Sequence, residues 1–400
     1  MTDVSAALPT WPFDRDDPLL PPPRLSELRS ACPVSQVEMW DGSCSWLATR
    51  HDDFKTLLRS PDLSAEAHRP NYPNSNANHA ASRGNQTSFI RRDDPEHATQ
   101  RRMLTAAFSV GQVATMRPFI ERLVDELLDD LAVQPQPADL VEHLAEPLPS
   151  HVICEIMDLP TEDSAFLNDR VNVWMDLDSP PAETAKATAD LAAYLENLVD
   201  TRTESLGDDL VSKLIRQHLL TAEISRGDFL SMLNVMIIGG FDTTANMIAL
   251  GTVLLLRHPD QMADLRANPD LMPGAIEEML RYLSVAHHVA ARVAKAEIEI
   301  RGVTIHDGDG VMASIPAANH DPEVFPEPER FDVRRDARDH VAFNFGIHQC
   351  LGQNLARLEL QVVFTKLLER FPALSLAVAE SDLVFRNSMI YGVNKVPVTW

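Results

Sequence analysis

Hydrophobic residues recur every three to four positions along most of the chain, which is the spacing of one face of an α-helix. The pattern becomes dominant from Pro95 onward, and a Pro180-Pro181 pair interrupts its longest stretch. Ten helical segments follow from it: 52–60, 95–107, 112–132, 139–157, 164–204, 208–219, 227–256, 259–267, 272–284 and 351–370.

Strand patterns are short and few. MWDGSCSWLATR (39–50) predicts two strands joined at Asp41-Gly42, and further strands are predicted at 290–304, at 309–315 and in the C-terminal tail. Two segments are predicted to be irregular: the proline-rich residues 1–35, and a long loop over 65–85. Because no repeat or linker separates the helices, the sequence predicts one domain over 1–400, mainly α with minor β.

The most apolar stretch, residues 231–256, raises the question of a membrane span. It is long enough to cross a bilayer and carries a single charge, Asp242, near its middle. A charge at that depth is costly, and Gly-Gly and two Thr residues surround it. We therefore interpret this stretch as the central buried helix of a soluble protein.

Composition excludes several classes of partner. The chain has 59 acidic and 35 basic side chains and a formal net charge of −24, which argues against nucleic acid or an anionic membrane as the partner. The four cysteines form no C-x-x-C pair and are too sparse for a disulfide framework. The N-terminal residues show no pattern of a secretory signal, so a reducing, cytoplasmic location is expected.

One cysteine stands in the unusual segment FNFGIHQCLGQNLAR, residues 343–357. Cys350 could be a buried structural cysteine, or a nucleophile with His348 as its base; a zinc site lacks partners at the right spacing. The helix that follows would direct free N–H groups toward the sulfur, and Gly346 and Gly352 would let a flat, bulky group approach the backbone. A thiolate in such a loop could also serve as the axial ligand of a haem iron.

Two further helical pairs are ambiguous by themselves. Glu278 and Arg281 lie three residues apart, and such pairs are usually exposed and weak. His97 and Arg101 lie four apart, so they share a helix face and could hold a carboxylate, although an exposed pair would have the same spacing.

GGFDTT (239–244) lies inside the most apolar helix. It could simply mark a kink, because glycines loosen a helix and a Thr hydroxyl can bond back to a carbonyl one turn earlier. The buried Asp242 beside Thr243 could instead feed protons to an interior site.

Taken together and in this order, these segments resemble the cytochrome P450 family. The pattern F-x-x-G-x-x-x-C-x-G is matched by Phe343, Gly346, Cys350 and Gly352, and E-x-x-R, PERF (328–331) and GGFDT stand in the expected order. The resemblance runs from about Asp41 to Trp400 and is greatest to soluble actinobacterial members. It implies the cytochrome P450 fold, with a long central helix over haem and small β-sheets.

The resemblance implies a role for each matched residue. Cys350 would be the proximal ligand of heme b, and Asp242 with Thr243 would relay protons to the reacting dioxygen. The haem propionates would be held by His97, Arg101, Arg292 and His348. Glu278, Arg281 and Arg330 would form a buried structural network that fixes the cysteine loop.

The substrate pocket would be apolar. Its residues are expected to be Met232, Val235, Met236, Gly239, Val289, Met389 and Ile390.

Three departures from the family pattern stand out. Asn344 replaces a common glycine and is expected to adopt a positive φ, His320 replaces a common arginine, and His287 and His288 fall near the pocket wall.

The implied activity is a monooxygenase that inserts one atom of O2 into a C–H bond of a medium-sized apolar substrate, such as a polyketide, a terpenoid, a steroid-like compound or a xenobiotic. Electrons would come from a ferredoxin and ferredoxin reductase, and the enzyme would act as a monomer. Because ferredoxins are acidic, a basic docking patch is expected among Arg101, Arg102, Arg334, Arg335, Arg338 and Arg357. The alternatives are a haem-thiolate nitric oxide reductase, a peroxide-driven peroxygenase, a non-catalytic haem binder and a haem-free cysteine hydrolase.

Overall fold

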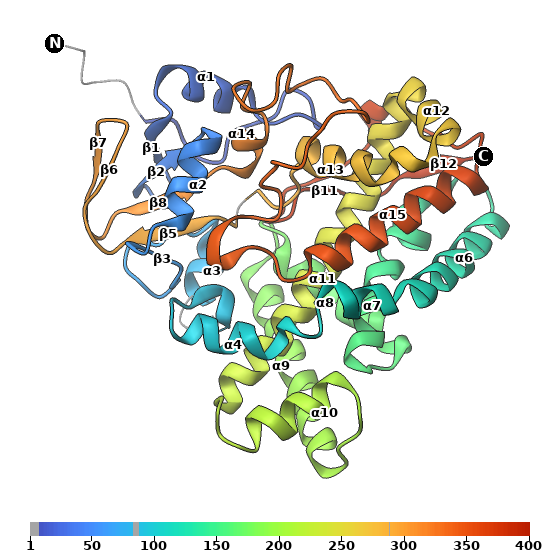
Figure 1. Ribbon diagram of the computed structural model, residues 1–400, viewed down its shortest axis with the longest axis horizontal. Helices are drawn as coiled ribbons and strands as arrows, with labels where there is room; N and C mark the ends of the chain where they lie inside the picture. Colours follow the sequence, from blue (N-terminus) through green and yellow to red (C-terminus); the bar gives the residue numbers. More distant parts are fainter. Residues whose placement is uncertain (1–7, 83–87, 288) are drawn as a thin grey trace.

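The computed structural model describes residues 8–82, 88–287 and 289–400, and it consists mainly of helices with a small sheet region at one side (Figure 1). The N-terminal half contains α1 Pro23–Ala31, α2 His51–Arg59, α3 Ala77–Ser82, α4 Glu96–Thr105, α5 Val110–Thr115, α6 Arg117–Val133, α7 Pro147–Met157, α8 Ser164–Met175 and α9 Pro181–Glu204. The C-terminal half contains α10 Leu210–Leu214, α11 Arg226–Arg257, α12 Pro259–Ala267, α13 Met272–Leu283, α14 Ile315–Asn319 and α15 Gln353–Arg370.

The largest sheet has five strands in the order β1-β2-β8-β5-β3. Its strands are β1 Val34–Glu38, β2 Cys44–Ala48, β3 Leu63–Ser64, β5 Ala291–Ala294 and β8 Gly310–Ala313. The first two form the hairpin predicted around Asp41-Gly42, and β2 then runs parallel to β8. Strand β5 lies between β8 and β3, so this sheet fixes the position of Arg292.

Within the described residues, three small sheets complete the β structure. The hairpin of β6 Ile298–Ile300 and β7 Val303–Ile305 projects at the edge of the sheet region (Figure 1). The tail contributes the hairpin of β10 Phe385–Arg386 and β11 Gly392–Val393, and β12 Pro397–Thr399 pairs with both β4 Ala138–Asp139 and β9 Ser375–Leu376. The predicted strands of the C-terminal tail are therefore confirmed.

The central helix is α11, and the other helices of the main core pack around it (Figure 1). It is apolar and long enough to cross a membrane, but 83% of its most apolar window is buried inside the protein. A helix that is hydrophobic on all sides needs such burial in a folded chain. The predicted buried central helix is confirmed.

Glycines allow close approaches to this helix, of which two concern α7 and the tail hairpin. A Cβ on Gly240 would lie 2.4 Å from a side-chain carbon of Ile153 in α7, and one on Gly392 in β11 would lie 1.6 Å from Oδ1 of Asn246. Neither approach could accommodate even a methyl group, so α7 and the tail hairpin are held directly against α11.

Three expectations for secondary structure need correction. Residues 1–35 are not wholly irregular, because α1 forms over Pro23–Ala31 with proline at its first position, where the missing N–H costs nothing. The 65–85 loop contains α3, whose first turn is supported by a hydrogen bond from the His79 amide to Oδ1 of Asn76. The segment 139–157 begins with a π-helical turn over Val141–Ala145 before α7.

Candidate functional site

The loop that carries Cys350 is closed by backbone contacts. The Cys350 amide donates to the carbonyl of Phe343 at 2.8 Å, and the Asn344 amide donates to Val341. Asn344 has a φ of 64°, as predicted, and Gly346 has a φ of 73°. A Cβ on Gly346 would lie 2.5 Å from the carbonyl oxygen of Leu58, so this glycine is required where the loop packs on α2.

The surroundings of Cys350 affect its thiol in two opposite ways. Cys350 is exposed, and yet desolvation by the surrounding protein raises the pKa of its thiol. Backbone N–H groups of Gly352 and Gln353, at the start of α15, act in the opposite direction and favour the thiolate. The sulfur therefore has both an open side and a preorganised set of donors for a negative charge.

Behind this loop, Glu278 of α13 lies at the centre of a buried ion-pair network. Its carboxylate accepts two hydrogen bonds from Arg281, at 2.6 and 2.8 Å, and neither side chain is exposed. Arg281 also donates to the carbonyls of Asn319 and Pro328, so it joins α13 to the segment that leads into the cysteine loop.

The third member of this network is Arg335, and the prediction of Arg330 was wrong. Nε of Arg335 donates to Oε1 of Glu278 at 3.1 Å. The Arg330 side chain is 62% exposed and pairs with Glu327 and Asp332, its neighbours in the chain. Arg330 contributes its backbone carbonyl instead, which accepts a hydrogen bond from Arg335.

The adjacent residue, Glu277, anchors the other end of the loop, and the sequence analysis missed it. Its carboxylate accepts hydrogen bonds from Arg357 of α15 at 2.7 and 2.9 Å and contacts Nε2 of His340 at 3.0 Å. Burial opposes ionisation, but the His340 and Arg357 hydrogen bonds prevail and lower its pKa to about 2. Two consecutive glutamates on α13 thus hold both sides of the cysteine loop.

A cluster of basic side chains lies near Cys350. The rings of His97 and His348 are 4.3 Å apart, and Nε2 of His97 and Nδ1 of His348 are buried without a hydrogen-bond partner. Arg292 is buried and makes its hydrogen bond to a backbone carbonyl, that of Ala291. Desolvation lowers the pKa of the Arg101 guanidinium, and the negative charge of a thiolate at Cys350 acts in the opposite direction.

Burial and mutual repulsion lower the pKa values in this cluster. Desolvation and then the charge of Arg292 lower the pKa of His348 to about 2, and desolvation lowers that of Arg292 to about 10. Buried cations without anionic partners are costly. The four predicted residues are therefore brought together in an arrangement that would be stabilised by carboxylates.

Arg91 and Tyr72 extend this cluster, and the sequence analysis missed both. Arg91 donates to the Tyr72 hydroxyl, and its charge adds to the lowering of the His348 pKa. Little in the sequence distinguishes Arg91 from its neighbour Arg92. Only the fold shows that their roles differ, because Arg92 forms an ion pair with Asp228 of α11.

On α11, Asp242 and Thr243 occupy a continuous helix with no opened turn. The Thr243 hydroxyl donates to the carbonyl of Gly239 at 2.8 Å, the back-bond that its position in the helix allowed. Asp242 is buried, and Oδ1 of its carboxylate accepts from Asn246 at 2.8 Å and from Arg386 at 2.9 Å. Desolvation raises the Asp242 pKa, against the effect of both donors.

Gly239 and Gly352 differ from the packing glycines in having open space on the side where a Cβ would lie, with no atom within 4 Å. Gly239 is exposed although it stands on the central helix. An exposed cysteine, open glycine faces and two buried imidazole nitrogens without a hydrogen-bond partner fit a flat group that offers a ligand position to sulfur and two carboxylates, as a haem does.

The predicted pocket residues divide into two groups. Val235, Gly239 and Val289 retain accessible surface. The others are at most 8% exposed and belong to the main core: Met232, Met236, Met389 and Ile390.

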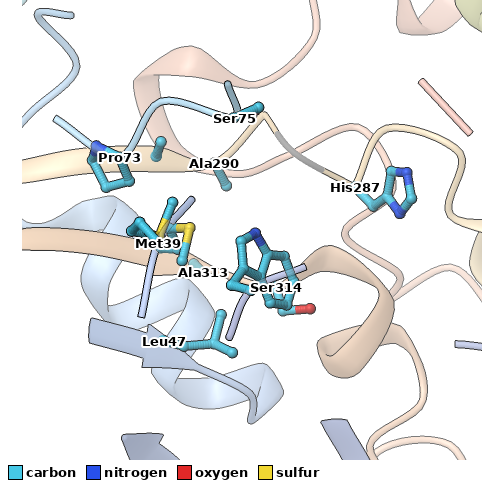
Figure 2. A pocket seen from close by; sticks show the side chains of 11 residues that line it. Met39, Leu47, Pro73, Ser75, His287, Ala290, Ala313 and Ser314 are labelled. Atoms are coloured by element: carbon cyan, nitrogen blue, oxygen red, sulfur yellow. The ribbon is translucent and has the colours of Figure 1, made fainter. Parts of the chain in front are cut away.

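A small cavity lies apart from the cysteine loop, between the N-terminal segment and the five-stranded sheet. Its volume is about 20 Å³, and Figure 2 shows Met39, Leu47 and Pro73 among the residues that line it. A space of this size holds about one water molecule, so it cannot take a medium-sized substrate.

The histidines named as departures have other surroundings. His287 lines this cavity, its Nδ1 lies 3.3 Å from a guanidinium nitrogen of Arg15, and its ring contacts Tyr391. His320 is buried, with Nδ1 3.1 Å from the Pro316 carbonyl. His288 lies outside the described residues.

Most of the arginines expected to form a basic docking patch are already paired. Arg334 binds Asp264, Arg338 binds Asp336, and Arg335 and Arg357 hold the two glutamates of α13. Arg102 remains exposed, and Arg59 of α2 lies over the ring of Phe345, in the cysteine loop, at 4.6 Å. Four of the six candidates are thus engaged in ion pairs within the protein, which leaves Arg101 and Arg102 for a patch.

Comparisons with known proteins agree with this geometry. The family model for cytochrome P450 matches residues 151–383. The chain is 44% identical to cytochrome P450-SU2 of Streptomyces griseolus, covering 100% of this chain and 97% of that protein. It is 42% identical to pentalenic acid synthase of Streptomyces avermitilis, covering 100% and 99%.

Among solved structures, mycinamicin VIII C21 methyl hydroxylase from Micromonospora griseorubida, bound to mycinamicin VIII, superposes with a TM-score of 0.93 at 37% identity, covering 98% of this chain and 100% of that one. Sequence and fold thus agree over nearly the full length. The chain belongs to the cytochrome P450 family and is a haem-dependent monooxygenase.

Proposed function

We propose that Cys350 is the thiolate ligand of a heme b in an enzyme that hydroxylates a medium-sized apolar substrate. The observation that carries this proposal is the exposed Cys350 thiol beside the backbone N–H groups of Gly352 and Gln353. Bound through a thiolate, the haem would supply the reductive activation of O2 and the insertion of one oxygen atom into a C–H bond, with the other atom leaving as water.

His97, Arg101, Arg292 and His348 would hold the two propionates. The support is the absence of any hydrogen-bond partner on Nε2 of His97 and Nδ1 of His348, together with the burial of Arg292, in the part of the chain that is described. Carboxylates at these positions would form charge-assisted hydrogen bonds and remove the cost of burying the cations. Arg91 and Tyr72 stand close enough to add donors to the same group.

Asp242 and Thr243 would deliver protons. Asp242 can hold a proton because burial raises its pKa, and the Thr243 hydroxyl is a donor that can exchange its Gly239 carbonyl for an oxygen atom of the reacting dioxygen. This pair favours monooxygenation over the peroxide-driven alternative, because reducing one atom of O2 to water consumes two protons, whereas a peroxide already carries them.

The substrate would contact the accessible face of α11. Val235 and Gly239 are four residues apart on that helix and both present surface, as does Val289 near the start of β5. These side chains are apolar, which suits a terpenoid, polyketide or steroid-like carbon skeleton. A relative named pentalenic acid synthase and a relative bound to mycinamicin VIII support this class of substrate.

A ferredoxin, reduced by its reductase, would supply the electrons, and the enzyme would work as a cytoplasmic monomer. The exposed Arg102 and the nearby Arg101 on α4, with Lys55 and Arg59 on α2 beside the cysteine loop, offer positive charge on an otherwise acidic protein. An acidic donor would be steered toward them.

The deciding experiment is the absorption spectrum of the dithionite-reduced protein under carbon monoxide. We expect the strongly red-shifted Soret band of a thiolate-ligated haem, and its loss in Cys350→Ala. Haem bound without that band would identify another axial ligand, with His348 the first to be tested. A protein that binds no haem would overturn the proposal.

A further inference from the structure

Asp242 belongs to a buried cluster of polar side chains that extends well beyond Thr243. Arg386 donates from one guanidinium nitrogen to Oδ1 of Asp242 at 2.9 Å, and from the other to Oδ1 of Asn172 at 3.2 Å. Asn172 in turn donates to Oε1 of Glu146 at 3.0 Å. One guanidinium is therefore linked to two carboxyl groups, directly to Asp242 and through an amide to Glu146.

Four separate parts of the chain build this cluster. Asp242 lies on α11, Arg386 on β10, Asn172 on α8, and Glu146 immediately before α7. The glycine contacts described above hold the tail hairpin and α7 directly against α11. These contacts position the elements that carry Arg386 and Glu146 close to Asp242.

The charges in the cluster do not balance if both acids are ionised. Asp139 of β4 also faces Glu146 and raises its pKa, and its carboxylate is occupied by the backbone N–H groups of Val141 and Val396. Arg386 is the guanidinium whose charge lowers the pKa of both acids, and the side chains of Asp242 and Arg386 are only 1% and 13% exposed. One buried and one partly buried carboxylate against one cation leave an unbalanced negative charge, which the protein interior disfavours.

We propose that Asp242 and Glu146 together retain one proton at neutral pH, through their common partner Arg386, and that this proton is the reserve from which Asp242 supplies the reaction. The proposal rests on the role of Asp242 given above. When Asp242 gives up its proton, a water-derived proton replaces it at Glu146, which is only partly buried. The O–H bond of Asp242 breaks as one forms on the acceptor, and the O–H bond that forms on Glu146 takes its proton from solvent hydronium, so the pair again holds one proton.

The titration behaviour of the two acids is consistent with this sharing. Desolvation raises the pKa of Glu146 against the effects of Asn172 and Arg386, and the charge of Asp242 raises it further. Desolvation likewise raises the pKa of Asp242 against Arg386 and Asn246. Two acids that interact in this way titrate as a pair.

Infrared difference spectroscopy of the haem-loaded protein tests the sharing directly, because a protonated carboxyl has a carbonyl band that a carboxylate lacks. We expect wild type to show the band of one shared protonated carboxyl at pH 7, and both Asp242→Asn and Glu146→Gln to lack it. In each variant the remaining acid should be ionised, because Arg386 balances its charge. Arg386→Gln should instead gain a second protonated carboxyl. A band that survives in one single variant and disappears in the other would overturn the proposal, because the proton would then belong to one acid alone.

Glu359 provides the matched control. It is a buried acid on α15 whose pKa burial raises to about 8, so Glu359→Gln should remove one protonated carboxyl without affecting the cluster band. This readout needs no turnover, so it remains informative even if the proposed relay by Thr243 fails.

Use of the proton is tested by the pH dependence of coupling, the fraction of electrons that reach product. Coupling should fall as the pH rises and the reserve proton is lost. In Glu146→Gln the neighbouring negative charge is absent, the Asp242 pKa falls, and the decline should move to lower pH with a larger solvent isotope effect. An unchanged pH profile in Glu146→Gln would overturn the proposal.

Discussion

Nε of Arg335 lies 3.1 Å from a carboxylate oxygen of Glu278, and this ion pair completes the network behind the cysteine loop. Arg335 also donates to the carbonyls of Pro326, Glu327 and Arg330. A single half-buried guanidinium therefore fixes the backbone of the segment that precedes Cys350 and links it to α13.

Arg335→Ala should lower the free energy of unfolding by about 2–4 kcal/mol, because it removes a charged partner of a fully buried glutamate and three carbonyl contacts. Arg330→Ala is the matched control, and it should change stability by less than about 0.5 kcal/mol since its pairs are exposed. Denaturant unfolding of both variants measures the difference. Equal losses in the two variants would contradict this assignment.

Glu359→Gln should stabilise the protein at alkaline pH. Burial raises the Glu359 pKa from 4.5 to about 8, so the stability that this group contributes is complete below pH 4.5 and is lost as the pH rises through about 8. Because glutamine does not ionise, the variant does not lose this stability. It should be more stable than wild type by about 1–3 kcal/mol at pH 8, with little difference at pH 4. Thermal unfolding at the two pH values is the measurement, and a difference of the same size at both would indicate an effect of packing.

Thr243→Ala should retain haem and substrate binding while diverting electrons from product to hydrogen peroxide. The hydroxyl is removed, but the helix keeps its backbone bonds, so the spin-state shift on substrate binding should be unchanged. Peroxide release per NAD(P)H consumed measures the effect. Full coupling in this variant would exclude Thr243 from proton delivery.

Arg102→Glu should slow reduction by a ferredoxin at low ionic strength, and the difference from wild type should shrink as salt is added. Arg102 is exposed on α4, while Arg24 on α1 is an exposed arginine in another part of the fold (Figure 1). Arg24→Glu makes the same change in net charge, and we expect the ferredoxin to reduce this variant at the wild-type rate. Equal slowing in both variants would point to net charge and not to a docking site at α4.

The sequence predicted most long helices, the buried character of α11 and the loop around Cys350, because these features depend on local periodicity and on glycine and asparagine at positive φ. It did not separate Arg330 from Arg335, which lie in the same loop with similar spacing to Glu278. Only the fold shows that Arg330 has acidic neighbours of its own in solvent.

The sequence also did not predict contacts between side chains that lie far apart along the chain. Nothing near Arg386 marks it as the ion-pair partner of Asp242, because that contact depends on how the tail hairpin packs on α11. Glu277 was overlooked beside Glu278 for the same reason, since its partner Arg357 lies on α15.

The two adjacent glycines of α11 have different surroundings and therefore different tolerance to substitution. Gly240 faces Ile153 at a distance that excludes any side chain, whereas Gly239 faces open space. Gly239, which we propose contacts the substrate, is therefore a position where a methyl or larger group can be added to test for a change in the oxidised carbon, while a side chain at its neighbour would require Ile153 to move.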